Sequence, residues 1–225
     1  MSKITWDAAG SRLYETGVSK GVLYVKNGDT YGKGVAWNGL TAVTESPSGA
    51  EATPLYADDI KYLNLVSAEE FGGTIEAYTY PDDFKACIGE AELSAGVSIG
   101  QQSRSTFGFC YRTAIGNDTD GTDKGYKLHL IYGALANVSE KAYATINDSP
   151  EAITFSWEFT TTPVSVATKV GDKSLKPTAC LTIDSTKVDK DKLTQLEAQL
   201  YGGDSTEPSL PLPDAVAAIF APAAG

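Results

Sequence analysis

The sequence is poor in the residues on which most metal sites and many enzymes depend. It contains one histidine, His129, and three cysteines, Cys87, Cys110 and Cys180, which lie far apart and form no C-x-x-C pair. A single imidazole and scattered thiols cannot provide the usual ligand set of a structural zinc site. An odd number of unclustered cysteines is typical of free, buried thiols in a reducing compartment. The sequence therefore predicts no metal site and no disulfide framework.

Basic residues are also scarce. The chain has 18 Lys and Arg residues against 29 Asp and Glu residues, which gives a formal net charge of −11. Proteins that bind nucleic acids tightly neutralise phosphates with Lys and Arg side chains. The composition therefore excludes a basic nucleic-acid footprint, although an acidic surface can let a polyanion slide past without binding it.

Long apolar runs are missing as well. No stretch reaches the ~18 apolar residues that a membrane-spanning helix requires, and the first residues contain no apolar segment of the secretory type. We therefore expect no membrane segment, and a protein that is made and kept in the cytosol or leaves it by lysis.

The sequence contains only incomplete matches to catalytic and ligand-binding motifs. Residues 96–100 match the G-x-S-x-G pattern, but a β pattern follows where a nucleophile elbow needs a helix, and His129 lies within an expected strand. Asp118, Asp120 and Asp123 do not fit the spacing of a calcium-binding EF-hand loop. The glycine-rich residues 28–34 lack the G-K-[ST] ending of a phosphate-binding loop. We expect no enzymatic activity and no cofactor.

What the chain does contain is β patterning. With 42% hydrophobic and 21% charged residues it can bury a sizeable core. Expected strands cover residues 21–25, 35–37, 40–43, 60–66, 71–80, 97–99, 105–115, 126–135, 141–146, 153–162 and 179–183, and expected helices cover residues 81–88 and 185–201. The predicted fold is mainly β, a β-sandwich or partly closed barrel with one flanking helix, followed by a C-terminal helix and an extended tail.

The pattern also predicts an internal organisation. Residues 1–184 form the β-sandwich, with an N-terminal arm over residues 1–20 and a long hairpin loop over residues 44–59. Residues 185–225 form the C-terminal helix, in which Leu193, Leu196 and Leu200 share one face, and a proline-punctuated arm.

The best-specified strand lies in residues 141–164, which we interpret as two strands joined by a turn over residues 147–150. In the second strand Ile153, Phe155, Trp157 and Phe159 alternate with small polar residues, so the aromatic side chains are expected on the buried face. The opposite, polar face is expected to be in contact with water.

The loop over residues 44–59 is longer than the ~12–15 residues at which compact domains usually stop. One interpretation is a mobile surface hairpin, and the other is an arm that becomes ordered against a neighbouring subunit, because Leu55 and Tyr56 favour burial. The residues expected to form that interface are Glu45, Pro54, Leu55, Tyr56, Asp58 and Asp59.

Several segments together resemble the major tail protein (tail tube protein) family of long-tailed, non-contractile bacteriophages. These segments are ITWDAAGSRLYETGVSKGVLYV, GVAWNGLTAVTESPSGAEATPLYADDIKYLNL, EEFGGTIEAYTYPDDFKAC, STFGFCYRT, GYKLHLIYGALA, KAYATINDSPEAITFSWEFTTTPV and LPLPDAVAAIF. The resemblance covers essentially the whole chain and rests on the order of the segments and their general residue pattern, with no single decisive motif.

The resemblance implies a β-sandwich with one flanking helix that assembles into hexameric rings. The rings would stack into a tube with a continuous β-barrel as its lumen, through which genomic DNA passes without specific binding. Other phage tail proteins would be partners, and the protein would be assembled in the host cytoplasm and reside in the virion tail. The long loop would make the inter-ring contact, and Glu76, Thr154, Ser156 and Glu158 are the candidates for the lumen.

Two alternatives stay open on the sequence. One is a virion or secretion-tube protein of the same fold that stops at a single ring. The other is a monomeric glycan- or host-binding β module, which would need exposed aromatic residues at loop tips, for which Tyr31, Trp37 and Tyr56 are the candidates.

Overall fold

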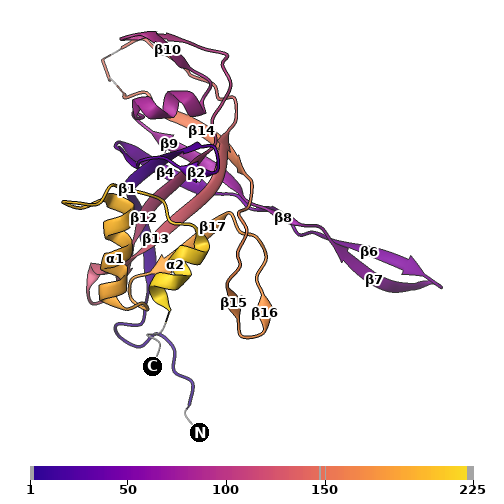
Figure 1. Ribbon diagram of the computed structural model, residues 1–225. Coiled ribbons are helices and arrows are strands. Elements are labelled where there is room, and N and C mark those ends of the chain that lie inside the picture. The colour runs from indigo at the N-terminus through magenta and orange to yellow at the C-terminus, as the bar shows by residue number, and fades with distance from the viewer. Residues whose placement is uncertain (1–2, 147, 150, 222–225) are drawn as a thin grey trace.

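The computed structural model describes residues 3–146, 148–149 and 151–221. The protein is mainly β, as predicted, and is built on one large antiparallel sheet with few helices (Figure 1). The strands of this sheet are β1 (Tyr14–Asn27), β2 (Thr30–Tyr31), β3 (Val35–Trp37), β4 (Leu40–Glu45), β9 (Gly72–Ala77), β12 (Phe107–Asn117), β13 (Gly121–Ala136), β14 (Phe155–Thr161) and β17 (Cys180–Asp184).

Smaller elements project from the sheet or cover it. The short strands pair as β5 (Ser48–Gly49) with β8 (Glu69–Glu70), β6 (Ala52–Ala57) with β7 (Ile60–Val66), β10 (Ala91–Ser94) with β11 (Val97–Ile99), and β15 (Lys169–Val170) with β16 (Lys173–Ser174). The helices are the 3-10 helix η1 (Asp82–Cys87) and the α-helices α1 (Lys190–Tyr201) and α2 (Pro213–Phe220).

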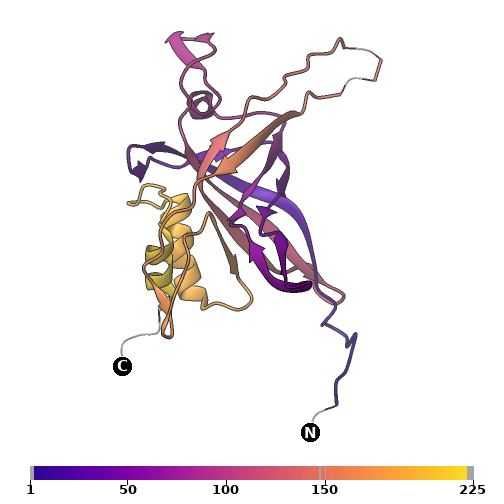
Figure 2. The same cartoon turned by 90° about the vertical axis from the view of Figure 1, so that its right-hand side faces the viewer.

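The main sheet curls into a partly closed barrel. Its strand order is β2-β1-β12-β13-β14-β9-β4, with β3 added to β1 and β17 added to β13. Asn38-Gly39 connects β3, which pairs with β1, to β4, which pairs with β9, so one short segment links strands near the two ends of this order. Figure 2 shows the curl of the sheet in a view turned by 90°. Gly39 has φ +75°, a conformation that glycine adopts without steric cost.

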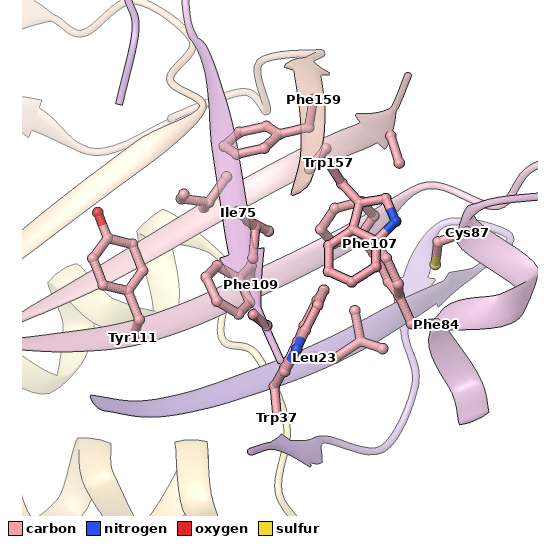
Figure 3. Close-up of a cluster of buried hydrophobic side chains, with 14 residues drawn as sticks. Leu23, Trp37, Ile75, Phe84, Cys87, Phe107, Phe109, Tyr111, Trp157 and Phe159 are labelled. Carbon is pink, nitrogen blue, oxygen red and sulfur yellow. The ribbon is translucent and has the colours of Figure 1, made fainter. Parts of the chain in front are cut away.

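The inside of the curl is an aromatic core (Figure 3). Trp157 of β14 lies edge-on to Trp37 and Phe84, with ring centroids 5.6 Å and 5.2 Å apart. As the alternation predicted, Trp157 and Phe159 are buried, Phe155 packs against the same cluster, and Ser156 and Glu158 are exposed. The prediction is wrong for Ile153, which lies before β14 begins and is exposed. Edge-to-face aromatic packing adds to the free energy gained from their burial.

The outer face of β1, β12, β13 and β17 is buried too. Helices α1 and α2 cover it and form a second core with Leu128, Leu130 and Tyr132 of β13. The predicted helix stripe of Leu193, Leu196 and Leu200 is confirmed, because all three leucines are buried in this core. The N-cap of α1 is Asp189, whose carboxylate accepts hydrogen bonds from the backbone N–H groups of residues 191 and 192.

Three predictions about local structure are wrong. The N-terminal arm ends earlier than residue 20, because residues 14–20 belong to β1 and pair with β12. Residues 141–146 form no strand, and of the turn expected over residues 147–150, residues 147 and 150 lie outside the described part. The extended tail contains helix α2, which begins with Pro213 at a first-turn position, where proline has no hydrogen bond to lose.

The helix predicted over residues 81–88 is present as η1. Phe84 and Cys87 are fully buried, and Ile88 packs against the same core. Burial raises the pKa of the Cys87 and Cys110 thiols to about 12, so both cysteines behave as small apolar side chains.

Asn117 connects the N-terminal segment to the turn between β12 and β13. It is the buried polar residue of the described chain, with 3% of its surface exposed. Its Nδ2 donates to Gly10 O at 3.2 Å and to Asp120 Oδ2 at 3.0 Å, and its Oδ1 accepts from the backbone N–H groups of Thr119 and Asp120.

We expect Asn117→Ala to lower the free energy of unfolding by about 1–3 kcal/mol, because it leaves buried polar groups without partners. Urea denaturation of the monomer would measure this change. The control is Asn64→Ala on the exposed strand β7, which should change the free energy by less than about 0.5 kcal/mol. Equal effects of the two substitutions would contradict the role assigned to Asn117.

Candidate functional site

A long hairpin leaves the barrel between β4 and β9. The pair β5–β8 forms its base and the pair β6–β7 forms its outer part, and we call residues 48–70 the arm (Figure 1). Asp58 and Asp59 form its tip with φ values of +51° and +62°, as in the tight turns that suit a twisted two-stranded ribbon. The hairpin predicted over residues 44–59 is present, but it extends to residue 70 and consists largely of strand.

One face of the arm is apolar and uncovered. Leu55 pairs with Leu63, Thr53 with Leu65 and Ala57 with Ile60, and directly paired residues project on the same side of a ribbon. We call Leu55, Ile60, Leu63 and Leu65 the arm face; their exposed fractions run from 38% to 64%. A two-stranded hairpin is only marginally stable in water, so this face needs a partner surface.

The structure divides the residues predicted for the interface. Pro54, Leu55 and Tyr56 lie in β6, and Asp58 and Asp59 lie at the tip, all of them exposed. Glu45 is separate from them, since it ends β4 beside the barrel and its Oε1 accepts a hydrogen bond from Tyr111 Oη at 2.6 Å.

Sequence reasoning missed three of the four residues of the arm face. Ile60, Leu63 and Leu65 lie in a strand that was predicted, but nothing in that prediction distinguished it from a core strand. The signal was available in residues 60–66, where five of the seven residues are aliphatic or aromatic, because a strand with such residues on both faces is either buried on both sides or in need of a partner.

The outer surface of β4, β9 and β14 forms a second candidate site, a polar sheet face. Ser156 pairs with Glu76, Glu158 pairs with Thr74, and Thr74 pairs on its other side with Thr44. Three of the four predicted lumen residues therefore lie side by side, while Thr154 lies just before β14 begins. These three strands contain no lysine or arginine, so the face presents hydroxyls and carboxylates without a phosphate-binding cation.

A cluster of polar side chains lies at one end of the aromatic core. The rings of Tyr111 and His129 are parallel, with centroids 4.5 Å apart, and His129 Nε2 lies 3.0 Å from Thr113 Oγ1. His129 Nδ1 lies 3.4 Å from Glu45 Oε1. The neighbouring His129 imidazole lowers the pKa of Glu45, and the hydrogen bond from Tyr111 lowers it further, while burial opposes both.

The main sheet has open edges. Residues 14–20 of β1 pair with β12 on one side, and within the described residues no strand pairs with their other side. Strand β17 likewise pairs with β13 alone among the described strands. Unpaired edges expose hydrogen-bonding groups that can pair with another chain.

Other candidate residues lie in settings that do not suit the chemistry considered for them. Ser98 is exposed in the β10–β11 hairpin, away from the strand-to-helix turn that a nucleophile elbow requires. Asp118 accepts a hydrogen bond from Gly10 N–H, and no cluster of three potential metal ligands occurs in the described part of the chain. Trp37 is buried and donates from Nε1 to Thr79 O, and Tyr31 is half-buried, so of the three aromatic candidates only Tyr56 is exposed.

No protein-family model matches the chain, and no curated protein shows significant similarity to it. Within the described residues, none of the helices has the length and apolarity that crossing a membrane would require.

Proposed function

We propose that this protein is a structural subunit that assembles with copies of itself into stacked hexameric rings, forming the tail tube of a bacteriophage. The observation that carries the proposal is the arm, an exposed ribbon with one apolar face that the rest of the chain leaves uncovered. A surface of this kind on a chain of otherwise ordinary composition marks a protein interface. In stacked rings the arm face would meet a different surface of a subunit in the next ring, a head-to-tail contact that can propagate.

The open edges of the sheet support ring formation. Residues 14–20 of β1 lie on one side of the four-stranded part β1-β12-β13-β17, and β17 lies on the other. Pairing of such edges between neighbouring subunits would satisfy their backbone groups and remove an aggregation hazard. Six copies closing in this way would form the ring.

The polar sheet face supports the role of a conduit for DNA. Its hydroxyls and carboxylates, together with the net charge of −11, offer no neutralisation to a passing phosphate backbone. In the proposed tube this face, with Glu76, Ser156 and Glu158, lines the lumen. The proposal includes no enzymatic activity. The proposed partners are other copies of this chain, other tail proteins and, transiently, the genomic DNA. The proposed location is the virion tail.

The test is negative-stain electron microscopy of the purified full chain at high concentration, combined with light scattering. We expect rings or tubes with a central channel. Single rings that never stack would favour the alternative of a one-ring protein. A strict monomer at all concentrations, also in the presence of tube ends from a phage lysate, would contradict the proposal and leave a monomeric binding module as the better account.

A further inference from the structure

A groove lies beside strand β17, between helix α2 and the segment that carries β15 and β16 (Figure 1). We call residues 164–178 the hairpin segment and the hollow the α2 groove, whose volume is about 510 Å³. Side chains from all three elements line the groove, and most of them are apolar. The main apolar contributors are Val166, Leu175, Leu181, Ile183, Val216 and Phe220.

The two walls of the α2 groove are fixed to each other. Asp214, in the first turn of α2, accepts hydrogen bonds from the backbone N–H groups of Ala167 at 3.0 Å and Thr168 at 2.8 Å. It also accepts from the Thr168 hydroxyl at 2.6 Å. At the base of the hairpin segment Val164 and Thr178 exchange two backbone hydrogen bonds of 2.9 Å. A partner would therefore find the groove already formed, which lowers the cost of binding.

The α2 groove is open to water in the single subunit. Leu175 keeps 42% of its surface exposed, and Leu181 and Phe220 are only half-buried. Strand β17, which lines the groove, pairs with β13 alone among the described strands. An apolar hollow beside a free strand edge is suited to an apolar partner.

The rim of the α2 groove is basic, in contrast to the acidic chain as a whole. The hairpin segment contains three lysines, Lys169, Lys173 and Lys176, and one acidic residue, Asp172, so its formal net charge is +2 against −11 for the whole chain. All three lysines are exposed, and within the described residues none of them forms an ion pair. The rim can therefore attract a negatively charged partner.

The arm has the complementary properties. It contains five acidic residues and one lysine, a formal net charge of −4, and two of the acids, Asp58 and Asp59, lie at its exposed tip. Its apolar arm face is uncovered. Figure 1 shows the arm extending away from α2 and the hairpin segment, so the two surfaces do not meet within one chain. A second copy of the chain can bring them together.

We propose that the arm of one copy docks in the α2 groove of a second copy, with the arm face against the apolar walls and the acidic residues of the arm beside the lysines of the rim. This inference rests on the proposed function, because it takes the arm as an interface, and it names the surface that receives the arm. Each copy gives one arm and receives another, so the contact is head-to-tail. Opposite charges guide the approach of the arm and set its orientation, while apolar burial supplies affinity.

Mixing two variants of the full chain tests this contact. Leu175→Asp places a carboxylate in the groove and leaves the arm intact, and Leu63→Asp combined with Leu65→Asp damages the arm and leaves the groove intact. We expect each variant alone to sediment as a monomer at concentrations where the native protein associates. Their equimolar mixture should form a 1:1 complex, because one variant still offers an arm and the other still offers a groove.

Val170→Asp is the matched control for the groove variant. Val170 belongs to the same hairpin segment and is exposed, but it does not line the groove. We expect this control to associate like the native protein. Lys173→Glu combined with Lys176→Glu tests the rim without touching the apolar walls. It should weaken the complex with the groove-deficient variant's intact arm about three- to tenfold at low salt, and less at about 0.5 M salt.

The outcomes separate this inference from the proposed function. If Leu175→Asp associates like the native protein while the arm variant stays monomeric, the arm is an interface but the α2 groove does not receive it, and this inference is overturned. A mixture that stays monomeric would overturn it too. If the arm variant associates like the native protein, the proposed function also loses its support. Because Lys173 and Lys176 are exposed, the rim variant keeps the test decisive even if Leu175→Asp does not fold.

Discussion

Replacing Trp157 with alanine is expected to lower the free energy of unfolding by about 3–5 kcal/mol. The indole is 2% exposed, and it is surrounded by the rings of Trp37, Tyr80 and Phe84 at centroid distances of 5.2 to 5.6 Å. Removing it opens a cavity between β14 and the opposite wall of the barrel, which the stiff sheet cannot collapse to fill.

Urea denaturation at concentrations where the protein is monomeric would measure the change. Ser156→Ala is the matched control, because Ser156 is the neighbouring residue of β14 and points to the polar sheet face. We expect this control to change the free energy by less than about 0.5 kcal/mol. A decrease in the free energy of unfolding of less than about 1 kcal/mol for Trp157→Ala would mean that the aromatic cluster contributes little to the stability of the barrel.

The double substitution Leu63→Asp and Leu65→Asp is expected to abolish assembly and leave a folded monomer. It places two carboxylates in the middle of the arm face, where an apolar interface would have to desolvate them. Both side chains are exposed in the single subunit, so its own fold loses little. Sedimentation velocity should show the monomer at concentrations where the native protein forms larger species.

Asn64→Asp is the control for this experiment. It adds a carboxylate on the same strand, between the two leucines and on the opposite face of the ribbon. We expect the control to assemble like the native protein. Tubes of native length from the double variant would show that the arm face is not an interface, and the proposed function would lose its main support.

The period-two patterns predicted where the strands lie and which side chains share a face, but they did not predict which strands are paired in the sheet. In β14 the alternation of aromatic and small polar residues specified both faces correctly, from Trp157 and Phe159 inside to Ser156 and Glu158 outside. The same segment was paired with residues 141–146, whereas β14 pairs with β13 and β9. A pattern along one strand says which side chains share a face and contains no information on the partner strand.

The second core was only partly foreseen. The leucine stripe of α1 was clear from the sequence, but its packing surface was not, because the expected strands over residues 105–115 and 126–135 do not reveal that both of their faces are buried. Helix α2 was missed because prolines at 208, 211 and 213 indicate an extended chain. Proline is also compatible with the first turn of a helix, and α2 begins at Pro213 and buries Val216 against the second core.

The candidate site shows the same limits. The sequence predicted that the segment after β4 forms an interface and identified Leu55 and Tyr56 in it. It could not separate the arm from Glu45, which lies at the end of β4 beside the barrel. Glu45 was grouped with the arm by position along the chain, whereas its contacts are with Tyr111 and His129, which come from two later strands. Contacts between distant segments of this kind depend on sheet register, which the sequence pattern alone does not give.

The two cores of this protein are completed at different times during synthesis. The barrel core draws on residues between Leu23 and Phe159, so every side chain that fills it has been made before β17 and the helices exist. The second core depends on residues as late as Val216. Until the ribosome has made α1 and α2, the outer face of β12 and β13 is exposed to water next to unpaired strand edges. The exposed side chains are those of Cys110, Leu128, Leu130 and Tyr132. Exposed apolar surface beside unpaired strand edges makes a partly folded chain prone to aggregation, so α1 and α2 form the last, protective layer of the fold.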